Sequence, residues 1–162
     1  MPERALVLLR HGKSDWSDDD VDDLRRPLSR RGERQAPEAG RWLSGNVQSI
    51  DLAVVSPAVR ARATWDLVSA ALDHPPRALV DDRVYEASVD DLLSVVQEID
   101  DEAHTVVLVG HNPGLEDLAH TLTGQAVALP TSALAVLTMS GSWSTAGPGS
   151  ALLRQSGRPP GP

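Results

Sequence analysis

The sequence of 162 residues lacks cysteine and phenylalanine altogether, and it holds a single tyrosine, Tyr85, and a single lysine, Lys13. Without cysteine the chain can form no disulfide and offer no thiolate nucleophile, so a reducing compartment is permitted. No apolar run approaches the ~20 residues that cross a bilayer, and the first one, over 5–9, is too short for a signal peptide. We therefore expect a cytoplasmic protein with no membrane partner and an aliphatic core.

Positive charge is also scarce, since 15 basic side chains stand against 23 acidic ones and give a net charge of −8 at pH 7. This balance argues against a broad nucleic-acid-binding face, and we expect no nucleic-acid partner. A small anionic ligand stays possible, because a local pocket can oppose the global charge. All the basic residues except Lys13 are arginines, so a lone arginine carries little weight.

Short apolar runs rich in valine and leucine alternate with amphipathic stretches along the chain. The runs predict buried strands over 5–9, 51–55, 105–109 and 134–139. A weaker strand is predicted over 78–80. The amphipathic stretches predict helices over 30–44, 57–72, 89–98 and 113–123, the first capped by Ser29 and the second by Ser56. This alternation is typical of an α/β three-layer sandwich, with a mostly parallel sheet and helices on both faces. We expect one domain over 1–154, a loop or hairpin over 140–149, and a disordered tail over 155–162.

Charged and histidine residues follow three of the predicted strands. Arg10 and His11 end the first, Arg60 falls in the first turn of the helix after the second, and His111 follows the strand over 105–109. The carboxyl ends of parallel strands are where such sheets bind ligands. Two arginines, two histidines and nearby helix N-termini predict an anion site there. Phosphate is the natural ligand because a guanidinium matches two phosphoryl oxygens, although carboxylate or sulfate would satisfy the same donors.

Two other interpretations of the paired histidines compete with an anion site. A metal would be repelled by the flanking arginines and lacks a carboxylate pair to complete its ligand set, so we expect no metal and no other cofactor. His11 and His111 could instead be hydrogen-bonded loop histidines, but their matching positions beside arginines argue against it. The remaining histidines lack such neighbours and are expected to be structural or exposed: His74, His104 and His120.

The acidic run over 18–23 predicts a solvated loop, with repulsion of unwanted anions or docking of a basic partner as alternatives. Trp16 is expected to form a wall of the pocket, because it follows His11 closely. As an isolated aromatic residue it could equally serve in packing or on the surface.

The stretch "LLRHGKSDW" resembles the RHG signature of the histidine phosphatase superfamily, whose fold is like that of phosphoglycerate mutase. "SPAVRARAT" is similar to the second arginine motif of that superfamily, and "VLVGHNPGLEDLAHTLTG" to its second histidine motif. Three further stretches resemble SixA-type phosphohistidine phosphatases: "DLRRPLSRRG", "VYEAS" and "LPTSALAVL". The similarity runs from about Ala5 to Met139 and implies a single histidine phosphatase domain.

The resemblance implies a role for each matching residue. His11 would be the nucleophile that takes up the phosphoryl group, and Arg10, Arg60 and His111 would hold its oxygens. Glu86 lies where larger relatives carry a general acid. Arg26, in "RRPL", is a further candidate for phosphate binding, with a plain surface arginine as an equal alternative.

The implied chemistry agrees with the residue types. The charge of Arg10 should lower the pKa of His11, so that one ring nitrogen is a free nucleophile while the other donates to a backbone carbonyl. Attack on phosphorus would give a phosphohistidine, which water then hydrolyses. Glu86 could protonate an alkoxide leaving group only if burial kept it protonated. An imidazole leaving from a phosphohistidine needs such help less.

Three functions are compatible with these residues and motifs. The first is a SixA-type phosphatase acting on a phosphohistidine carried by a protein partner, and the second is a phosphomonoesterase for a small phosphorylated metabolite. The third is a non-catalytic module that binds phosphate and regulates. A mutase is less favoured, because keeping the phosphoryl group calls for an enclosed pocket that excludes water.

Overall fold

A computed structural model describes residues 3–161, and its centre is one six-stranded sheet. The strands are β1 (Arg4–Arg10), β2 (Leu52–Val55), β3 (Arg77–Val80), β4 (Thr105–Gly110), β5 (Leu134–Met139) and β6 (Ala151–Gly157). Their order across the sheet is β3-β2-β4-β1-β5-β6. Strands β1 to β4 are parallel, whereas β5 is antiparallel to both β1 and β6. The prediction of a mostly parallel α/β sheet is confirmed.

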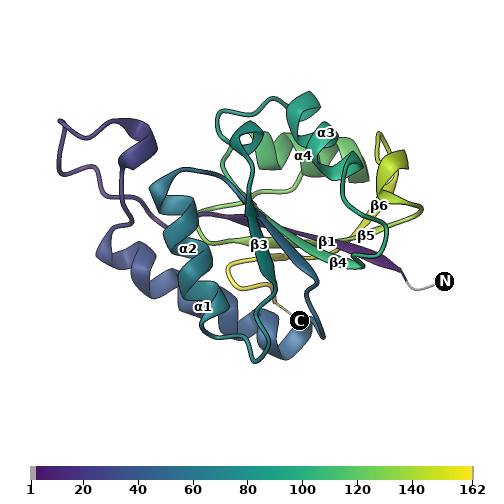
Figure 1. Cartoon of the computed structure of the whole chain (residues 1–162), viewed down its shortest axis with the longest axis horizontal. Coiled ribbons are helices and arrows are strands. Elements are labelled where there is room, and N and C mark those ends of the chain that lie inside the picture. Colours follow the sequence, from purple (N-terminus) through teal and green to yellow (C-terminus); the bar gives the residue numbers. More distant parts are fainter. Residues whose placement is uncertain (1–2, 162) are drawn as a thin grey trace.

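Four α-helices cover the two faces of this sheet, as Figure 1 shows. They are α1 (Arg30–Asn46), α2 (Val59–Ser69), α3 (Val89–Gln97) and α4 (Gly114–Thr123). Helices α1 and α2 lie on one face, and α3 and α4 lie on the other. Three short 3-10 helices lie in the connections: η1 (Asp23–Arg25), η2 (Asp82–Val84) and η3 (Trp143–Thr145). The expected three-layer sandwich is therefore present, and no helix within 3–161 is long and apolar enough to span a bilayer.

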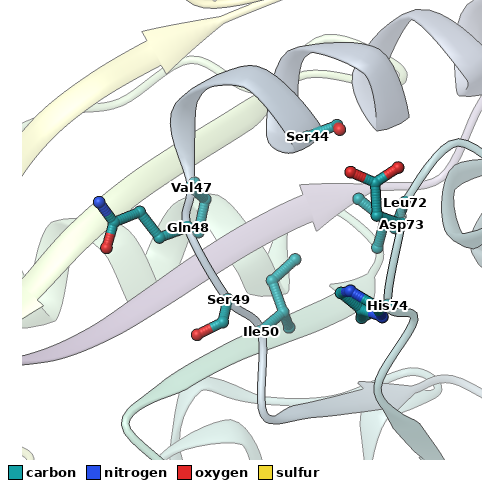
Figure 2. A pocket seen from close by; sticks show the side chains of 8 residues that line it. All are labelled: Ser44, Val47, Gln48, Ser49, Ile50, Leu72, Asp73 and His74. Carbon is teal, nitrogen blue, oxygen red and sulfur yellow. The ribbon is translucent and has the colours of Figure 1, made fainter.

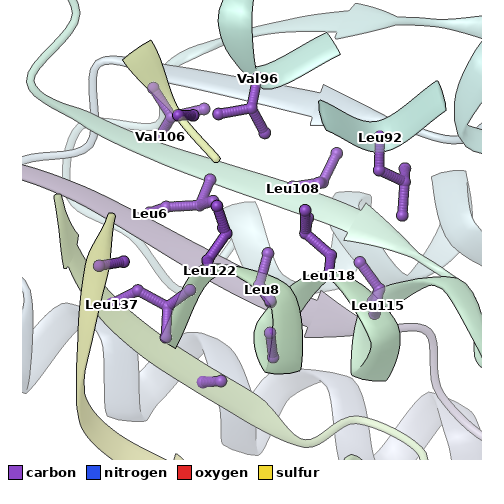
Figure 3. Packing of buried hydrophobic residues seen from close by; sticks show 14 of the residues in the cluster. Leu6, Leu8, Leu92, Val96, Val106, Leu108, Leu115, Leu118, Leu122 and Leu137 are labelled. Carbon is purple, nitrogen blue, oxygen red and sulfur yellow. The ribbon is translucent and has the colours of Figure 1, made fainter. Parts of the chain in front are cut away.

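Strand β1 explains why the apolar runs do not alternate with polar residues. Leu6 and Leu8 point into the core beneath α3 and α4, while Val7 and Leu9 point to the α1 and α2 side, and all four are fully buried. Figure 3 shows Leu6 and Leu8 among leucines from α3 and α4. A strand covered on both faces needs apolar residues at every position.

The helix starts agree only partly with the sequence expectations. The Ser29 side chain caps α1 by accepting a hydrogen bond from Gly32 N, as predicted. The predicted cap at Ser56 is wrong, because α2 begins at Val59 with Ala58 at its N-cap position. The Ser56 hydroxyl oxygen accepts from the Ala58 N–H over 3.2 Å, just before the helix, and it also contacts a histidine of the site described below. Ser56 therefore bonds to the backbone at the approach to α2, two residues before the N-cap position.

The predicted disordered tail over 155–162 is wrong for its first part. Strand β6 continues to Gly157 and pairs with β5, so residues 155–157 belong to the sheet. The strand escaped prediction because only one of its faces is covered and arginine, glutamine and glycine dilute its apolar pattern. Residues 158–161 follow the sheet with Pro160 bridged to Gly157, and residue 162 lies outside the described residues. The loop predicted over 140–149 contains η3.

A projecting arm leaves the body of the molecule shortly after strand β1 (Figure 1, purple). We define the arm as residues 15–27, because a bridge between Ser14 and Leu28 closes its base. The Asp15 N–H also donates to the Pro27 carbonyl over 2.8 Å. The 3-10 helix η1 lies within the arm and has no buried residue.

Candidate active site

Three neighbouring strands bring the predicted site residues to one edge of the sheet. Arg10 at the end of β1 is paired in register with Gly110 at the end of β4, so the residues that follow them lie side by side. The ring centroids of His11 and His111 are 5.1 Å apart. Strand β2 is the other neighbour of β4 and leads into α2, which carries Arg60 in its first turn. The topology thus places all three segments around one point.

A cavity of about 420 Å³ opens at this point. Its lining includes every residue predicted for the site, which are Arg10, His11, Arg26, Arg60, Glu86 and His111. It also includes residues that were not predicted for it, notably Asp23, Tyr85 and Asn112. Trp16 lines the cavity as expected, with two thirds of its surface still exposed.

His11 is buried, and its Nδ1 lies 2.7 Å from the Gly12 carbonyl oxygen. Because a carbonyl can only accept, Nδ1 must carry the proton and Nε2 holds the free lone pair. Burial lowers the pKa of His11 to about 4, with smaller contributions from the charges of Arg60 and Arg10. The predicted direction of the pKa shift is confirmed, but burial contributes more to it than Arg10. At neutral pH this imidazole is uncharged, with the lone pair of Nε2 free.

His111 is also uncharged at neutral pH. Burial and then the neighbouring His11 and Arg60 lower the pKa of His111 to about 3. Its Nδ1 lies 3.4 Å from an Arg60 guanidinium nitrogen and its Nε2 lies 2.7 Å from the Ser56 hydroxyl. Since the guanidinium can only donate, Nε2–H donates to Ser56. In the free protein, the positive charge of the cavity therefore comes from arginines and from Lys13, which also lines the cavity.

Three arginines supply most of that charge, and their side chains are held by their surroundings. Arg10 donates from Nη1 to the Leu129 carbonyl over 3.1 Å. Arg26 is 7% exposed and lies against the ring of Trp16, with its guanidinium carbon 3.5 Å from the ring centroid. Arg60 is 5% exposed. The placement of Arg26 in the cavity favours the site interpretation over that of a surface arginine.

Asp23 joins two of these arginines and was not predicted to do so. Its carboxylate forms an ion pair with Arg26 over 2.8 Å, and it accepts hydrogen bonds from Arg60 over 3.0 Å and from the Tyr85 hydroxyl over 2.6 Å. Partial burial opposes ionisation, but the bonds from Tyr85 and Arg60 outweigh it and lower the pKa of Asp23. The same bond to Asp23, with burial, raises the pKa of Tyr85 to about 12. A carboxylate thus already lies among the arginines. Asp23 is exposed, as the solvated-loop prediction for 18–23 expects, but it also takes part in the cavity.

Glu86 lines the cavity but is exposed to solvent. Its backbone has a φ of 52°, in the left-handed region that non-glycine residues seldom adopt. The burial on which its proposed acid role depended is absent. Within residues 3–161, no group of three or more His, Asp or Glu side chains could hold a metal ion.

A second cavity, of about 110 Å³, lies away from these residues (Figure 2). It is formed by the end of α1 and the segments that follow α1 and α2, and it is lined by Ser44, Val47, Gln48, Ser49, Ile50, Leu72, Asp73 and His74. None of these lining residues is an arginine or a lysine. The second cavity therefore lacks the fixed cations that the larger cavity presents at the strand ends.

Known proteins share this fold and this sequence pattern. The family described as the histidine phosphatase superfamily (branch 1) matches residues 6–105. An uncharacterized protein of Mycobacterium tuberculosis is 36% identical over 156 residues, which cover 90% of this chain and 96% of the relative.

Two solved structures resemble the whole chain. A proposed phosphohistidine phosphatase SixA from Nakamurella multipartitia is 29% identical, with a TM-score of 0.83 over 97% of this chain and 96% of its own. The protein histidine phosphatase SixA, solved with tungstate, is 26% identical, with a TM-score of 0.81 over 94% of this chain and 95% of its own. The sheet and its arginine-lined cavity define an α/β protein of the phosphoglycerate mutase-like fold. The chain belongs to the histidine phosphatase superfamily, and its SixA-type resemblance is confirmed.

Proposed function

We propose that this protein is a phosphatase that transfers a phosphoryl group to His11 and then to water, and that its substrate is a phosphohistidine carried by a protein. The observation that carries the proposal is the state of His11. Its Nδ1 proton is engaged by Gly12, so the unprotonated Nε2 is left for attack in a cavity with three arginines. A nucleophile and a set of cations for the equatorial oxygens are the two requirements of metal-free phosphoryl transfer.

The reaction would proceed in two displacements. In the first, the Nε2 lone pair of His11 attacks phosphorus, the P–N bond of the substrate breaks, and its electron pair stays on the leaving imidazole. That imidazole departs uncharged when its other nitrogen is already protonated. In the second, water attacks phosphorus, the bond to Nε2 breaks, and inorganic phosphate leaves. The entering dianion would favour a protonated His111, which then donates to phosphoryl oxygen alongside Arg10 and Arg60.

The exposure of Glu86 favours a labile substrate over a phosphate ester. An alkoxide leaving group needs a proton, and a positioned acid usually contributes ~10²–10⁴-fold to such a step. Glu86 is exposed to solvent, so it lacks the burial that such an acid needs. An imidazole leaving group makes no such demand. The tungstate in the SixA structure is a phosphate-shaped anion, and this supports a phosphoryl ligand for the related cavity here.

The proposal is tested by trapping the intermediate. The protein is mixed with phosphoramidate, and we expect acid-labile, alkali-stable phosphate on His11 and release of inorganic phosphate. His11→Ala should abolish both, whereas His74→Ala, at an exposed histidine remote from the cavity, should keep both. Binding of phosphate without any adduct or turnover in the unaltered protein would contradict the proposal and indicate a binding module.

The substrate class is tested separately with a panel of phosphohistidine proteins, sugar phosphates and nucleotides. We expect kcat/KM to be highest for a phosphohistidine protein. A preference for one small metabolite would overturn that part of the proposal and leave the covalent step intact. Glu86→Gln supports the same comparison, since an exposed side chain that does not protonate the leaving group should matter no more for an alkyl phosphate than for p-nitrophenyl phosphate. A loss confined to the alkyl phosphate would show that Glu86 acts as a general acid and would weaken the case for a labile substrate.

A further inference from the structure

The loop that follows His11 is held by a buried threonine one helical turn beyond Arg60. The Gly12 N–H donates to Thr64 Oγ1 over 2.9 Å, and Thr64 Oγ1 donates to the Arg60 carbonyl over 2.7 Å. Thr64 is completely buried. Since its only proton goes to Arg60, its oxygen must accept from Gly12. One hydroxyl therefore connects the nucleophile segment to the helix that carries Arg60.

The next peptide of the same loop is held from α1. The Lys13 N–H donates to Gln35 Oε1 over 3.2 Å, and Gln35 is 9% exposed. The peptide that contains this N–H also contains the Gly12 carbonyl. That carbonyl is the acceptor for His11 Nδ1. Thr64 and Gln35 thus fix two successive peptides, and the second presents the oxygen that decides which ring nitrogen of His11 keeps its proton.

The surroundings leave this loop little freedom to find another arrangement. A Cβ on Gly12 would lie 3.0 Å from the Gly32 carbonyl oxygen, so the loop packs directly on the first turn of α1. If the Thr64 hydroxyl were removed, the buried Gly12 N–H would lose its acceptor, at a cost typical of an unsatisfied buried donor. The loop would then shift to find one, and the Gly12 carbonyl would move with it.

We propose that Thr64, with Gln35 in support, is a positioning residue that selects the reactive tautomer of His11 by orienting the peptides on either side of Gly12. This inference rests on the proposed function, because it assigns the two residues to the step in which His11 attacks phosphorus. Neither side chain lines the cavity. Both therefore act through the loop, without contact with the substrate.

The test compares Thr64→Val, which keeps the shape but loses the hydroxyl, with Thr64→Ser, which keeps the hydroxyl. We expect Thr64→Val to slow phosphorylation of His11 by roughly 100-fold, as small misplacements of a reacting group do. It should also shift the ring ¹⁵N resonances of His11 away from the Nδ1-protonated pattern. Thr64→Ser should retain both the original rate of phosphorylation and the original ¹⁵N pattern. Thr123→Val is the matched control, because Thr123 likewise donates to the carbonyl four residues earlier and accepts from a backbone N–H, but in α4.

Several outcomes would overturn the proposal. A folded Thr64→Val protein with a lower melting temperature but the original tautomer and rate would show a merely structural residue. An equal loss of rate in Thr123→Val would show the same. If Thr64→Val does not fold, Gln35→Met replaces it and Gln35→Glu serves as the rescue, with the same expectations. The ¹⁵N measurement needs no turnover. It therefore tests the tautomer of His11 even if the protein proves not to be a phosphatase, and the two proposals can fail separately.

Discussion

At the scale of single residues, His11 and His111 place two uncharged imidazoles next to three arginines. Burial is the first cause of both low pKa values, and the guanidinium groups act in the same direction. Keeping the two imidazoles uncharged makes the free energy of unfolding depend on pH. A histidine whose pKa is lower in the folded protein than the ordinary 6.5 binds its proton more readily when the chain unfolds. The free energy of unfolding therefore has its full value above pH 6.5, and it decreases as the pH falls below 6.5.

We predict that the free energy of unfolding falls as the pH is lowered from 6.5 toward 4. His11→Asn should remove the share that belongs to His11 and reduce the fall by about 1–3 kcal/mol, since one pKa unit corresponds to ~1.4 kcal/mol. Urea unfolding at pH 7 and pH 4.5 measures the effect. His74→Asn, at an exposed histidine, should keep the original dependence, and parallel curves for all three proteins would contradict the assignment.

Asp23 supplies a second prediction at this scale. Its carboxylate occupies donors of Arg26 and Arg60 that an incoming phosphate would use. Asp23→Asn removes one negative charge from the cavity and should tighten binding of inorganic phosphate roughly fivefold, or ~1 kcal/mol, the interaction of two unit charges about 4 Å apart at the dielectric of water. Titration calorimetry measures this. Asp20→Asn removes an equal charge from an exposed position of the arm and should change little, whereas weaker binding in Asp23→Asn would show that the carboxylate orients the arginines.

The sequence predicted the residues at the strand ends because topology alone brings them together. Arg10, His11 and His111 follow buried strands, and parallel strands end at the same edge. Asp23 and Thr64 could not be predicted in this way. Their partners are distant in sequence, at Arg60 and Tyr85 for one and at Gly12 for the other. An aspartate in an acidic run and a threonine in a helix carry no local signal of such contacts.

At the scale of the elements, the start of α1 packs so closely against the loop that follows His11 that only glycine fits. A Cβ on Gly32 would lie 2.2 Å from the Lys13 carbonyl oxygen. Gly45, near the other end of the same helix, has open space around it. The two glycines thus separate the effect of packing from that of helix propensity.

We predict that Gly32→Ala destabilises the protein by about 2–3 kcal/mol through overpacking and lowers the rate of His11 phosphorylation, because Lys13 must move. Gly45→Ala should instead stabilise by up to ~1 kcal/mol, the difference in helix propensity. Chemical denaturation and the phosphoramidate reaction measure the two effects. Equal stabilities for the two variants would contradict the close approach.

Element boundaries differ in how far the local sequence determines them. The strands were located because burial on both faces leaves a continuous apolar run, as in β1 and β4. Strand β6 was missed because one face is open. The start of α2 was placed too early because Ser56, which bonds to the Ala58 N–H and to His111, lies two residues before the N-cap position. The local sequence therefore located the elements that carry a clear apolar pattern, and it was less exact where that pattern was weak.

At the scale of the whole molecule, the cavity exists only in the folded chain, because its arginines and histidines come from segments 100 residues apart, as His11 and His111 do. A ligand that binds only this state must stabilise it. We predict that inorganic phosphate raises the melting temperature, with about 2.7 kcal/mol of stabilisation at 100 times its Kd. Arg60→Gln should suppress the shift. Arg62→Gln, at an exposed arginine of the same helix, should preserve it, and a shift that survives in Arg60→Gln would place the anion elsewhere.

The residues that line the cavity come from two parts of the molecule, the sheet and the arm over residues 15–27, and these parts are held in place to different degrees. His11 extends from β1, which has a strand on each side, whereas Asp23 and Arg26 sit on a projection whose 3-10 helix buries nothing. Amide hydrogen exchange should therefore be slow behind His11 and fast across the arm. The ion pair from Asp23 to Arg60 and the hydroxyl of Tyr85 fasten that projection to the body in the resting protein. A phosphoryl group held by both Arg26 and Arg60 would connect the arm to the body in the same way. Binding at the site should therefore slow amide hydrogen exchange in residues 15–27.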